Sequence, residues 1–271
     1  MKKTVLITGA NSGIGKEATI QLLKNDCHLI ACCRNKEKAE KTIEEIKQKS
    51  NSNDIRLIIM DMSSLKSIKN AVELILKEYS NIDVLIHNAA DFDISRKTIE
   101  YSEDGIEKVF ATNHLGPVYL TDLLLPIIPK NNNSRIITVA SKGLIMHPFL
   151  KINFDDIEFK NSKYSVEKAY YQSKLAQIMY TYWLADKLKP YNINVNSVWV
   201  TNVKIDISRY PGLSDFQKKL YNMKSKFSIS PNDMAKVYVE IALSDSFANI
   251  NGKVVDKNLN FVNTNSYSKN N

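Results

Sequence analysis

The first 25 residues constrain the fold more than any other part of the chain. Residues 3–8 are a segment rich in β-branched residues, typical of a buried strand. They run directly into Gly9-Ala10-Asn11-Ser12-Gly13-Ile14-Gly15, which is followed by a helical pattern over 16–25. A strand, a glycine-rich turn and a helix in this order bring backbone N–H groups and a positive helix end to one point, where a pyrophosphate can bind. Three of the chain's eight glycines lie in this turn, which disfavours a purely local role for it.

Predicted strands and helices alternate along the rest of the chain. Strands are predicted near 3–8, 27–33, 55–60, 82–88, 134–140, 192–199 and 252–256, and helices near 14–25, 36–49, 64–79, 103–129, 163–189 and 232–243. This alternation predicts an α/β fold: a single doubly wound parallel sheet of the Rossmann type, with about seven strands and helices on both faces. We expect one domain over 1–261 and a polar, disordered tail over 262–271.

The distribution of charge argues against binding of nucleic acid. The formal net charge is +8, but lysines lie along predicted helices such as 35–49, where they alternate with glutamates as solvated helix faces do. The sequence shows no basic stripe with interleaved aromatic residues, of the kind that binds single strands. A mild positive field also suits an anionic dinucleotide.

The cysteines and histidines predict neither disulfides nor a metal site. Cys27, Cys32 and Cys33 fall in one predicted strand without metal-ligand spacing, and the four histidines are scattered, so we expect reduced, packed thiols in a cytoplasmic protein. No apolar run approaches the length of about 20 residues that spans a bilayer. Because the first strand starts almost at Met1, we also expect no signal peptide and no N-terminal anchor.

Tyr170 and Lys174 are the clearest candidates for acid–base chemistry. Four residues apart on a helix, their side chains share one face. A free phenol has a pKa of about 10, so a tyrosine that exchanges a proton near neutral pH needs a neighbouring cation to lower that value. The spacing alone equally fits a snorkelling surface lysine.

In combination and in this order, the motifs resemble those of the short-chain dehydrogenase/reductase family. The resemblance spans residues 3–260 and is closest to the retinol-dehydrogenase-like, or WW-domain oxidoreductase-like, branch. It implies a nicotinamide cofactor and the interconversion of a carbonyl and an alcohol. The motifs that carry it are Thr8-Gly9-x-x-x-Gly13-x-Gly15, Ala31-Cys32-Cys33-Arg34-Asn35, Asn88-Ala89, Glu103-Asp104-Gly105-Ile106-Glu107, Asn113-His114-Leu115-Gly116-Pro117, Ser134-Arg135-Ile136-Ile137, Ser141 and Tyr170-Tyr171-Gln172-Ser173-Lys174-Leu175-Ala176.

The resemblance implies a catalytic set of Asn113, Ser141, Tyr170 and Lys174. Ser141 would hydrogen-bond to the substrate carbonyl, and Tyr170 would give it a proton as hydride arrives from the nicotinamide. Lys174 would hold the nicotinamide ribose and lower the Tyr170 pKa, while Asn113 would position a water molecule. Other roles stay open from the residues alone: Ser141 as a cap, Asn113 as a satisfied buried amide, and Tyr171 as the tyrosine that faces the site, although only Tyr170 keeps the four-residue spacing.

The residue after the second strand indicates which dinucleotide would bind. A carboxylate at this position accepts a ribose 2′-hydroxyl, whereas an arginine accommodates a 2′-phosphate. Here the position holds Arg34, followed by Asn35, so the sequence favours NADP(H). Asp61 resembles the aspartate that contacts adenine in the family, although a role in capping the next helix fits it almost as well. The full set expected to contact the cofactor is Gly9, Asn11, Ser12, Gly13, Ile14, Gly15, Arg34, Asn35, Asp61, Met62, Asn88, Ala89, Tyr170, Lys174 and Val203.

Three segments depart from the family pattern. The family's Asn-Ala-Gly element appears here as Asn88-Ala89-Ala90, without its glycine. After the sixth strand, where the family has Pro-Gly followed by a threonine that holds the nicotinamide carboxamide, the chain has Val200-Thr201 and then Ile205, which cannot hydrogen-bond through its side chain. Residues 206–230, with Pro211-Gly212 inside, break the alternation and either cover a substrate pocket or form an inert insertion.

The sequence therefore predicts an NADP(H)-dependent oxidoreductase that acts on a lipophilic aldehyde, ketone or retinoid-like substrate. A small-molecule carbonyl or alcohol is the expected partner, and a homodimer is possible. The altered nicotinamide loop keeps an alternative open, a dinucleotide-binding regulatory or interaction protein with reduced turnover. Turnover distinguishes the two, since both would bind NADPH.

Overall fold

A seven-stranded parallel sheet forms the centre of the computed structural model, which describes residues 2–130, 132–207 and 212–269. Within these residues the strand order is β3-β2-β1-β4-β5-β6-β7. The strands are β1 (Thr4–Thr8), β2 (His28–Cys33), β3 (Ile55–Ile59), β4 (Val84–Ile86), β5 (Ser134–Ser141), β6 (Ile193–Val200) and β7 (Lys253–Val255). Each coincides with a predicted strand, and the doubly wound α/β fold is confirmed.

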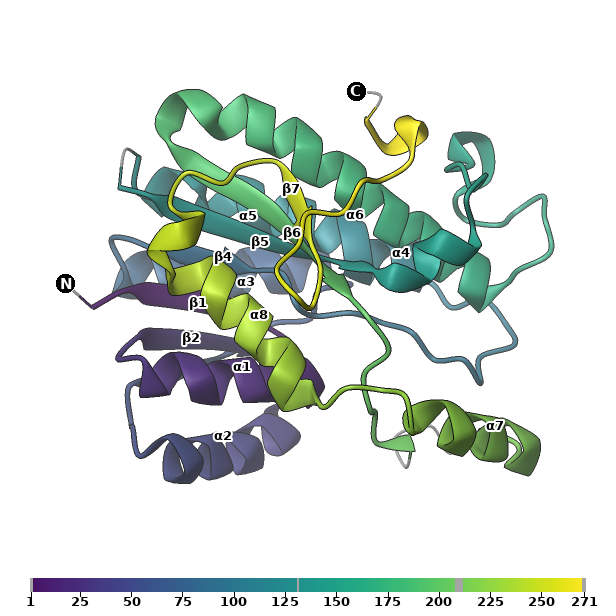
Figure 1. Cartoon of the computed structure of the whole chain (residues 1–271), viewed down its shortest axis with the longest axis horizontal. Coiled ribbons are helices and arrows are strands. Elements are labelled where there is room, and N and C mark those ends of the chain that lie inside the picture. The colour runs from purple at the N-terminus through teal and green to yellow at the C-terminus, as the bar shows by residue number, and fades with distance from the viewer. Residues whose placement is uncertain (1, 131, 208–211, 270–271) are drawn as a thin grey trace.

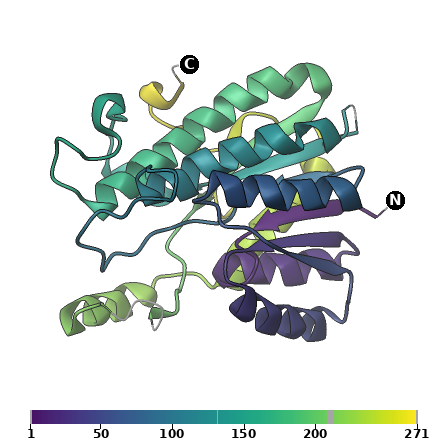
Figure 2. The same ribbon diagram turned by 180° about the vertical axis from the view of Figure 1, so that it is seen from behind.

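Helices cover both faces of this sheet. On the face toward the viewer of Figure 1 lie α1 (Gly13–Lys24), α2 (Lys36–Ser50) and α8 (Pro231–Leu243). On the other face, shown in Figure 2, lie α3 (Leu65–Glu78), α5 (Gly116–Leu124) and α6 (Val166–Leu188). Further helical segments are α4 (Lys108–Phe110), α7 (Asp215–Ser225), a π-helical turn (Ala111–Leu115) and 3-10 turns at Leu125–Ile127, Lys142–Met146, Phe154–Asp156, Lys189–Tyr191, Asp245–Phe247 and Ser266–Lys269.

Strand β1, third in the order of the sheet, explains the run of apolar residues over 5–7 near the start of the sequence. Val5 and Ile7 pack into the core under α1, α2 and α8, whereas Leu6 packs into the core on the opposite face. All three side chains are fully buried. Successive residues of a strand point to opposite faces, so a strand covered on both sides needs apolar residues at every position.

The predicted helix over 103–129 begins later than expected. Gly105 has a φ of +76°, which places a turn where the sequence predicted helix, and the first helical residue is Lys108. The carboxylate of the buried Glu107 caps this start by accepting the backbone N–H groups of Val109 (3.1 Å) and Phe110 (2.8 Å). The prediction of helix over 103–107 is therefore wrong, because the Asp-Gly pair there forms a turn.

Segments between and beyond the last strands depart from the regular alternation. Helix α7 lies in the segment 206–230 and stands apart from the sheet, beyond the carboxyl ends of the strands (Figure 1). Pro211 lies outside the described residues. In the expected tail, Ser266–Lys269 forms a 3-10 turn and Ser268 is buried. The domain boundary at residue 261 stays a prediction.

Candidate active site

The glycine-rich turn joins β1 to α1 and has the backbone shape that the sequence predicted. Gly9 has a φ of +67°, and a Cβ atom there would come within 3.0 Å of the Cα of Ala89. At Gly15 a Cβ would stand 2.2 Å from the carbonyl oxygen of Gly9, so a side chain would separate helix and turn. Gly13 has a φ of +53° but faces open space, because a Cβ there would meet nothing within 4 Å. These glycines shape the turn and leave room beside it.

The start of α1 offers donors to an anion. Ser12 is its N-cap residue, yet the Ser12 side chain makes no capping hydrogen bond, and the first helical turn contains no acidic residue. The first backbone N–H groups of a helix have no intrahelical acceptor and carry the positive end of the helix dipole. Asn11 lies half-buried on the same turn, while Ile14 packs against the core.

Asn88 and Ala89, which follow β4, hold the glycine-rich turn in place. The Asn88 amide nitrogen donates to the carbonyl oxygens of Thr8 (2.9 Å) and Gly9 (3.1 Å), and the backbone N–H of Ala89 donates to the Thr8 hydroxyl (3.0 Å). The Asn88 amide oxygen accepts from the hydroxyl of Tyr238, a fully buried residue of α8, at 3.3 Å. Sequence reasoning expected Asn88 beside the adenosine ribose and did not find Tyr238, because the helical pattern of α8 marks it only as core.

Arg34 lies at the carboxyl end of β2 with an exposed side chain. Within the part of the chain that the structure describes, its guanidinium makes no hydrogen bond and no ion pair. Asn35 has a local role, because its side chain caps α2 by accepting the backbone N–H of Lys38 at 2.9 Å. An unpaired guanidinium at this strand end can receive a phosphate.

Asp61 and Met62 follow β3. The Asp61 carboxylate accepts both the backbone N–H (2.9 Å) and the hydroxyl (2.8 Å) of Ser63, which closes a turn before α3. The α3 cap itself is Ser64, whose hydroxyl accepts from the backbone N–H of Ser67. Met62 is buried. The structure thus gives Asp61 a turn-forming role close to the capping alternative, and it leaves the adenine contact a prediction.

Tyr170 and Lys174 share one face of α6, as their spacing requires. Lys174 is 2% exposed, its ammonium donates to the backbone carbonyl of Val139 in β5 at 2.9 Å, and it lies 5.6 Å from the centre of the Tyr170 ring. Burial lowers the pKa of Lys174 to about 8. The lysine therefore remains mostly charged at neutral pH, directly beside the phenol.

The structure also separates Tyr170 from its neighbour Tyr171. Tyr170 stacks on Phe92, with ring centres 4.0 Å apart and ring planes inclined by 22°. Tyr171 instead packs against His147, and its hydroxyl lies so close to Gly143 that a Cβ there would be 2.2 Å away. Burial raises the pKa of Tyr171. The Lys174 ammonium lies over the ring of Tyr170, whereas Tyr171 packs on His147, which supports the register chosen from the sequence.

Ser141 is the last residue of β5, two residues after Val139, whose carbonyl accepts from Lys174 of α6. Its hydroxyl accepts the backbone N–H of Gly143 at 3.2 Å, so it caps the following 3-10 turn. That bond uses one lone pair and leaves the hydroxyl hydrogen for another acceptor. The capping role and a contact with substrate are therefore compatible.

Asn113 lies in the π-helical turn and is buried. Its amide oxygen accepts the backbone N–H of Asp91 (2.7 Å), and its amide nitrogen donates to the carbonyl of Asp91 and to the hydroxyl of Ser173 (both 3.1 Å). Ser173 in turn donates to the carbonyl of Tyr170 at 2.7 Å. Asn113 thus joins the loop after β4 to α6 beside Lys174. This contact is the one expected of a buried amide whose hydrogen bonds are satisfied.

The loop after β6 contains Ile205, at which the sequence departs from the family pattern. Val203 pairs with Ile229 in an isolated parallel bridge, and the Ile205 side chain is 43% exposed. The hydroxyl of Tyr221 in α7 accepts the backbone N–H of Ile205 (2.6 Å) and donates to its carbonyl (2.9 Å). Sequence reasoning did not identify Tyr221, because this contact depends on how α7 folds back on the loop.

Other features of the described residues limit the kinds of site. Cys27, Cys32 and Cys33 are unpaired and buried, as predicted. In the described ranges, no three His, Cys, Asp or Glu side chains gather as ligands of a metal ion would. Among the same residues, no helix combines the length and the apolarity that crossing a membrane would require.

Known proteins share this fold and these motifs. A family model of the short chain dehydrogenases matches residues 3–151. Retinol dehydrogenase 13 of Mus musculus is 32% identical over 257 residues, which cover 94% of this chain and 75% of that protein. An uncharacterized protein from Mycobacterium paratuberculosis has a TM-score of 0.74 at 24% identity, covering 99% of this chain and 87% of the other. A short-chain dehydrogenase from Shigella flexneri, solved in complex with NADP, has a TM-score of 0.70 at 19% identity, covering 94% and 97%. The chain therefore belongs to the short-chain dehydrogenase/reductase family of oxidoreductases, in its retinol-dehydrogenase-like branch.

Proposed function

We propose that this chain is an NADP(H)-dependent oxidoreductase that interconverts a carbonyl and an alcohol. One observation carries the proposal: the buried ammonium of Lys174 lies 5.6 Å from the Tyr170 ring, on the helix that follows Ser141. A cation beside a phenol favours the ionised phenol and therefore proton exchange near neutral pH. Membership of a family that uses nicotinamide dinucleotides supports the same chemistry.

The residues around the glycine-rich turn fit a dinucleotide. Open space at Gly13 and the uncapped start of α1 suit a pyrophosphate. Asp61 and Met62 would border the adenine, Asn88 and Ala89 the adenosine ribose, and Val203 the nicotinamide. The turn residues proposed to surround the pyrophosphate are Gly9, Asn11, Ser12, Gly13, Ile14 and Gly15.

Arg34 is the reason to prefer NADP(H). Its exposed guanidinium has no partner among the described residues, and Asn35 and Lys36, rather than an acidic residue, follow it at the end of β2. A 2′-phosphate would supply the missing anion through charge-assisted hydrogen bonds. The NADP complex of the Shigella flexneri relative supports this choice by analogy of fold.

The four candidate catalytic residues would each have a separate role in the reaction. When bound, NADPH would supply hydride to the carbonyl carbon. The carbonyl oxygen would take its proton from the Tyr170 hydroxyl while the Ser141 hydroxyl donates a hydrogen bond to the same oxygen, and the reverse direction would use Tyr170 as the base. Lys174 would stabilise the ionised Tyr170, and Asn113 would fix the loop and helix that meet beside it.

The name of the mouse relative supports a lipophilic substrate. Retinol is a long, apolar alcohol, and we extend this only to the class of lipophilic aldehydes, ketones and their alcohols. The three unpaired, buried cysteines support a reducing compartment, so we propose that the protein is cytoplasmic. We keep residues 1–261 as the proposed catalytic domain.

A second function, that of a dinucleotide-binding regulatory protein, rests on the loop after β6. The Ile205 side chain offers no hydrogen bond to a carboxamide, and its backbone N–H and carbonyl are already engaged by Tyr221. Poorly held nicotinamide would lower hydride transfer more than binding.

Cofactor titration followed by a carbonyl screen tests both functions. We expect NADPH to bind more tightly than NADH, and at least one lipophilic aldehyde or ketone to cause loss of reduced-cofactor absorbance. Equal affinity for the two cofactors would contradict the NADP(H) assignment. Tight binding of NADPH without turnover on a broad panel would favour the regulatory function.

A further inference from the structure

The loop between β4 and α4 is held at Asp91 by contacts from both sides. Asn113 bonds to the backbone N–H and to the carbonyl of this residue. The Asp91 carboxylate accepts two hydrogen bonds from the guanidinium of Arg96, at 2.9 and 3.2 Å. These side chains are 17% and 8% exposed, so the pair is largely shielded from water. A bidentate pair of this kind fixes orientation as well as distance.

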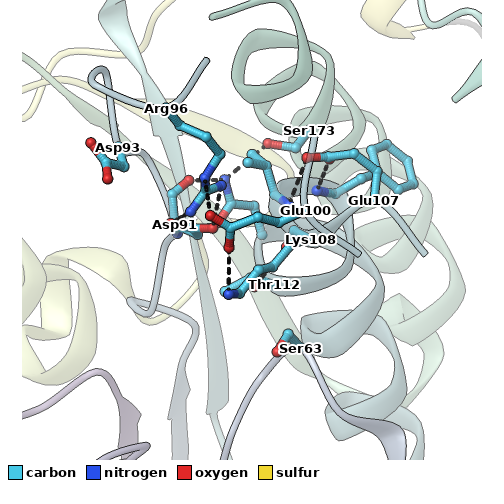
Figure 3. A network of polar contacts seen from close by, with 12 residues as sticks. Ser63, Asp91, Asp93, Arg96, Glu100, Glu107, Lys108, Thr112 and Ser173 are labelled. Atoms are coloured by element: carbon cyan, nitrogen blue, oxygen red, sulfur yellow. Dashed lines mark hydrogen bonds and ion pairs between the residues drawn. The ribbon is translucent and has the colours of Figure 1, made fainter. Parts of the chain in front are cut away.

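The ion pair extends into a chain of charges along the loop (Figure 3). The Arg96 Nε lies 3.1 Å from a carboxylate oxygen of Glu100, and the second oxygen of Glu100 accepts from the ammonium of Lys108 at 2.7 Å. Lys108 opens α4, which leads directly into the π-helical turn that holds Asn113. These contacts therefore connect both ends of the loop. We call the four residues that make them the brace: Asp91, Arg96, Glu100 and Lys108.

The brace supports the residue that touches Tyr170. Phe92 follows Asp91 directly, and its half-buried ring stacks on the Tyr170 ring with 4.0 Å between centres. The loop has no regular secondary structure here, so the side-chain contacts of its neighbours decide where the Phe92 ring lies. Ser95, three residues after Phe92, lies against Gly212 in the segment before α7. The two are so close that a Cβ atom added to Gly212 would be 2.9 Å from the Ser95 hydroxyl oxygen.

We propose that Phe92 is a specificity-determining residue that forms an apolar wall of the substrate site beside Tyr170, and that Arg96 is a positioning residue that holds this wall through Asp91. The inference deepens the proposed function and rests on it for the role of Tyr170. An aromatic ring presents a flat face that favours conjugated and aromatic groups over flexible saturated chains. The selected substrates are therefore carbonyl compounds with a conjugated or aromatic group next to the carbonyl.

Binding of two ketones tests the role of Phe92 without requiring turnover. Benzylideneacetone is conjugated and aromatic, and methyl octyl ketone is a saturated chain of equal carbon number. Their dissociation constants are measured by ligand-observed NMR on protein saturated with NADP⁺, which cannot reduce them. We expect the wild type to bind the conjugated ketone about tenfold more tightly, within the range of an aromatic pair in contact. Phe92→Ala should abolish this preference. Phe92→Leu keeps an apolar side chain without the ring, and it should retain only a small part of the preference for the conjugated ketone. Equal affinities in the wild type, or an unchanged preference in Phe92→Ala, would overturn the proposal.

A double-mutant cycle tests whether Arg96 acts through Phe92. Arg96→Lys keeps the charge but loses the bidentate geometry. In the wild-type background it should reduce the preference for the conjugated ketone several-fold. In Phe92→Ala it should have no further effect, because the ring that Arg96 holds through Asp91 is absent and the two changes are not additive. The matched control is Arg56→Lys, since Arg56 of the edge strand β3 makes a similar bidentate pair with Glu78, at 2.8 and 2.7 Å. An equal effect of Arg96→Lys in both backgrounds would show a general structural role and contradict positioning through Phe92.

Hydrogen exchange separates this inference from the proposed function. The amide of Asp91 is protected by Asn113, so loosening the brace in Arg96→Lys should speed its exchange, and Arg56→Lys should leave it unchanged. Unchanged exchange in Arg96→Lys would contradict the brace. A wild type that turns over no carbonyl but shows the ketone preference and its loss would reject the enzyme function and keep the inference about Phe92.

Discussion

At the scale of single residues, Lys174 combines deep burial with a charge. Only 2% of the residue is exposed, and among the described residues the backbone carbonyl of Val139 accepts its hydrogen bond. Desolvation penalises an ammonium in such a place, which is why its pKa falls to about 8. The same positive charge lies 5.6 Å from the centre of the Tyr170 ring, and in the proposed function it stabilises the ionised phenol. Stability and reactivity are therefore linked at this lysine.

The lysine gives a pH dependence with a defined sign. Its folded pKa lies below the unfolded value, so the unfolded chain binds more protons between about pH 8 and pH 10.5, and the free energy of unfolding rises with pH there. The shift corresponds to roughly 3 kcal/mol. We expect Lys174→Met to remove this rise, measured as urea midpoints of both proteins across that pH range. Parallel curves for the two proteins would contradict the lowered pKa.

Tyr170 should be essential for turnover and dispensable for cofactor binding. Tyr170→Phe keeps the ring that stacks on Phe92 but removes the hydroxyl, so turnover should fall by roughly 10²-fold or more. The affinity for NADPH, measured by cofactor fluorescence, should change little. Tyr171→Phe is the control, because Tyr171 packs on His147 and Gly143. A severe loss in the control would mean that the assigned register of α6 is wrong.

Arg34 should decide the choice of dinucleotide. Arg34→Asp replaces a cation with a carboxylate, which would lose charge-assisted hydrogen bonds to a 2′-phosphate and add repulsion. NADPH affinity should fall by a few kcal/mol, and NADH should become the better ligand. Titration of both cofactors against wild type and variant measures the switch. Arg56→Asp, at an exposed site on β3, controls for the change in net charge.

At the scale of elements, strand–turn–helix units bring the site together. β1 and α1 shape the glycine-rich turn, β5 ends at Ser141, and α6 presents Tyr170 and Lys174. Each of these units is local in sequence, so periodicity and glycine placement were enough to predict it. The strands and the register of α6 were predicted for this reason.

Other parts of the site depend on contacts that sequence does not reveal. The stacking of Phe92 on Tyr170 joins residues far apart in the chain, and the Asp91–Arg96 pair forms only because the loop folds back on itself. The late start of α4 could have been found, because Asp104-Gly105 is a turn signal. The π-helical turn that carries Asn113 could not, since the sequence pattern of a π-turn is that of an ordinary helix.

The loop after β6 is the element whose repair should increase activity. Ile205→Thr would place a hydroxyl where the family carries a threonine, while the backbone contacts with Tyr221 stay in place. We expect faster hydride transfer in single-turnover stopped flow, with NADPH affinity nearly unchanged. Ile205→Val, a matched change without the hydroxyl, should have no such effect. A similar gain with valine would assign the effect to loop packing.

At the scale of the whole molecule, the sheet divides two apolar layers. One lies under α1, α2 and α8, and the other under α3, α5 and α6. The Tyr238 hydroxyl of α8 donates to Asn88 after β4, and Asn88 holds Thr8 and Gly9, so a late helix of the chain contacts the glycine-rich turn near its start. The turn is therefore supported by the last helix as well as by the first, and formation of the cofactor site depends on completion of the fold.

The rate at which a thiol reagent labels the three cysteines of the β2 region can report how often the folded molecule opens. All are unpaired and buried, and burial raises the pKa values of Cys27 and Cys33 to about 11, so the reactive thiolates are scarce in the native state. A thiol reagent should label them only as fast as β2 becomes exposed. A ligand that binds only the folded chain slows such exposure in proportion to its occupancy. Labelling rates measured at increasing NADPH concentrations would then yield the cofactor affinity by mass spectrometry alone, with no substrate and no catalytic step.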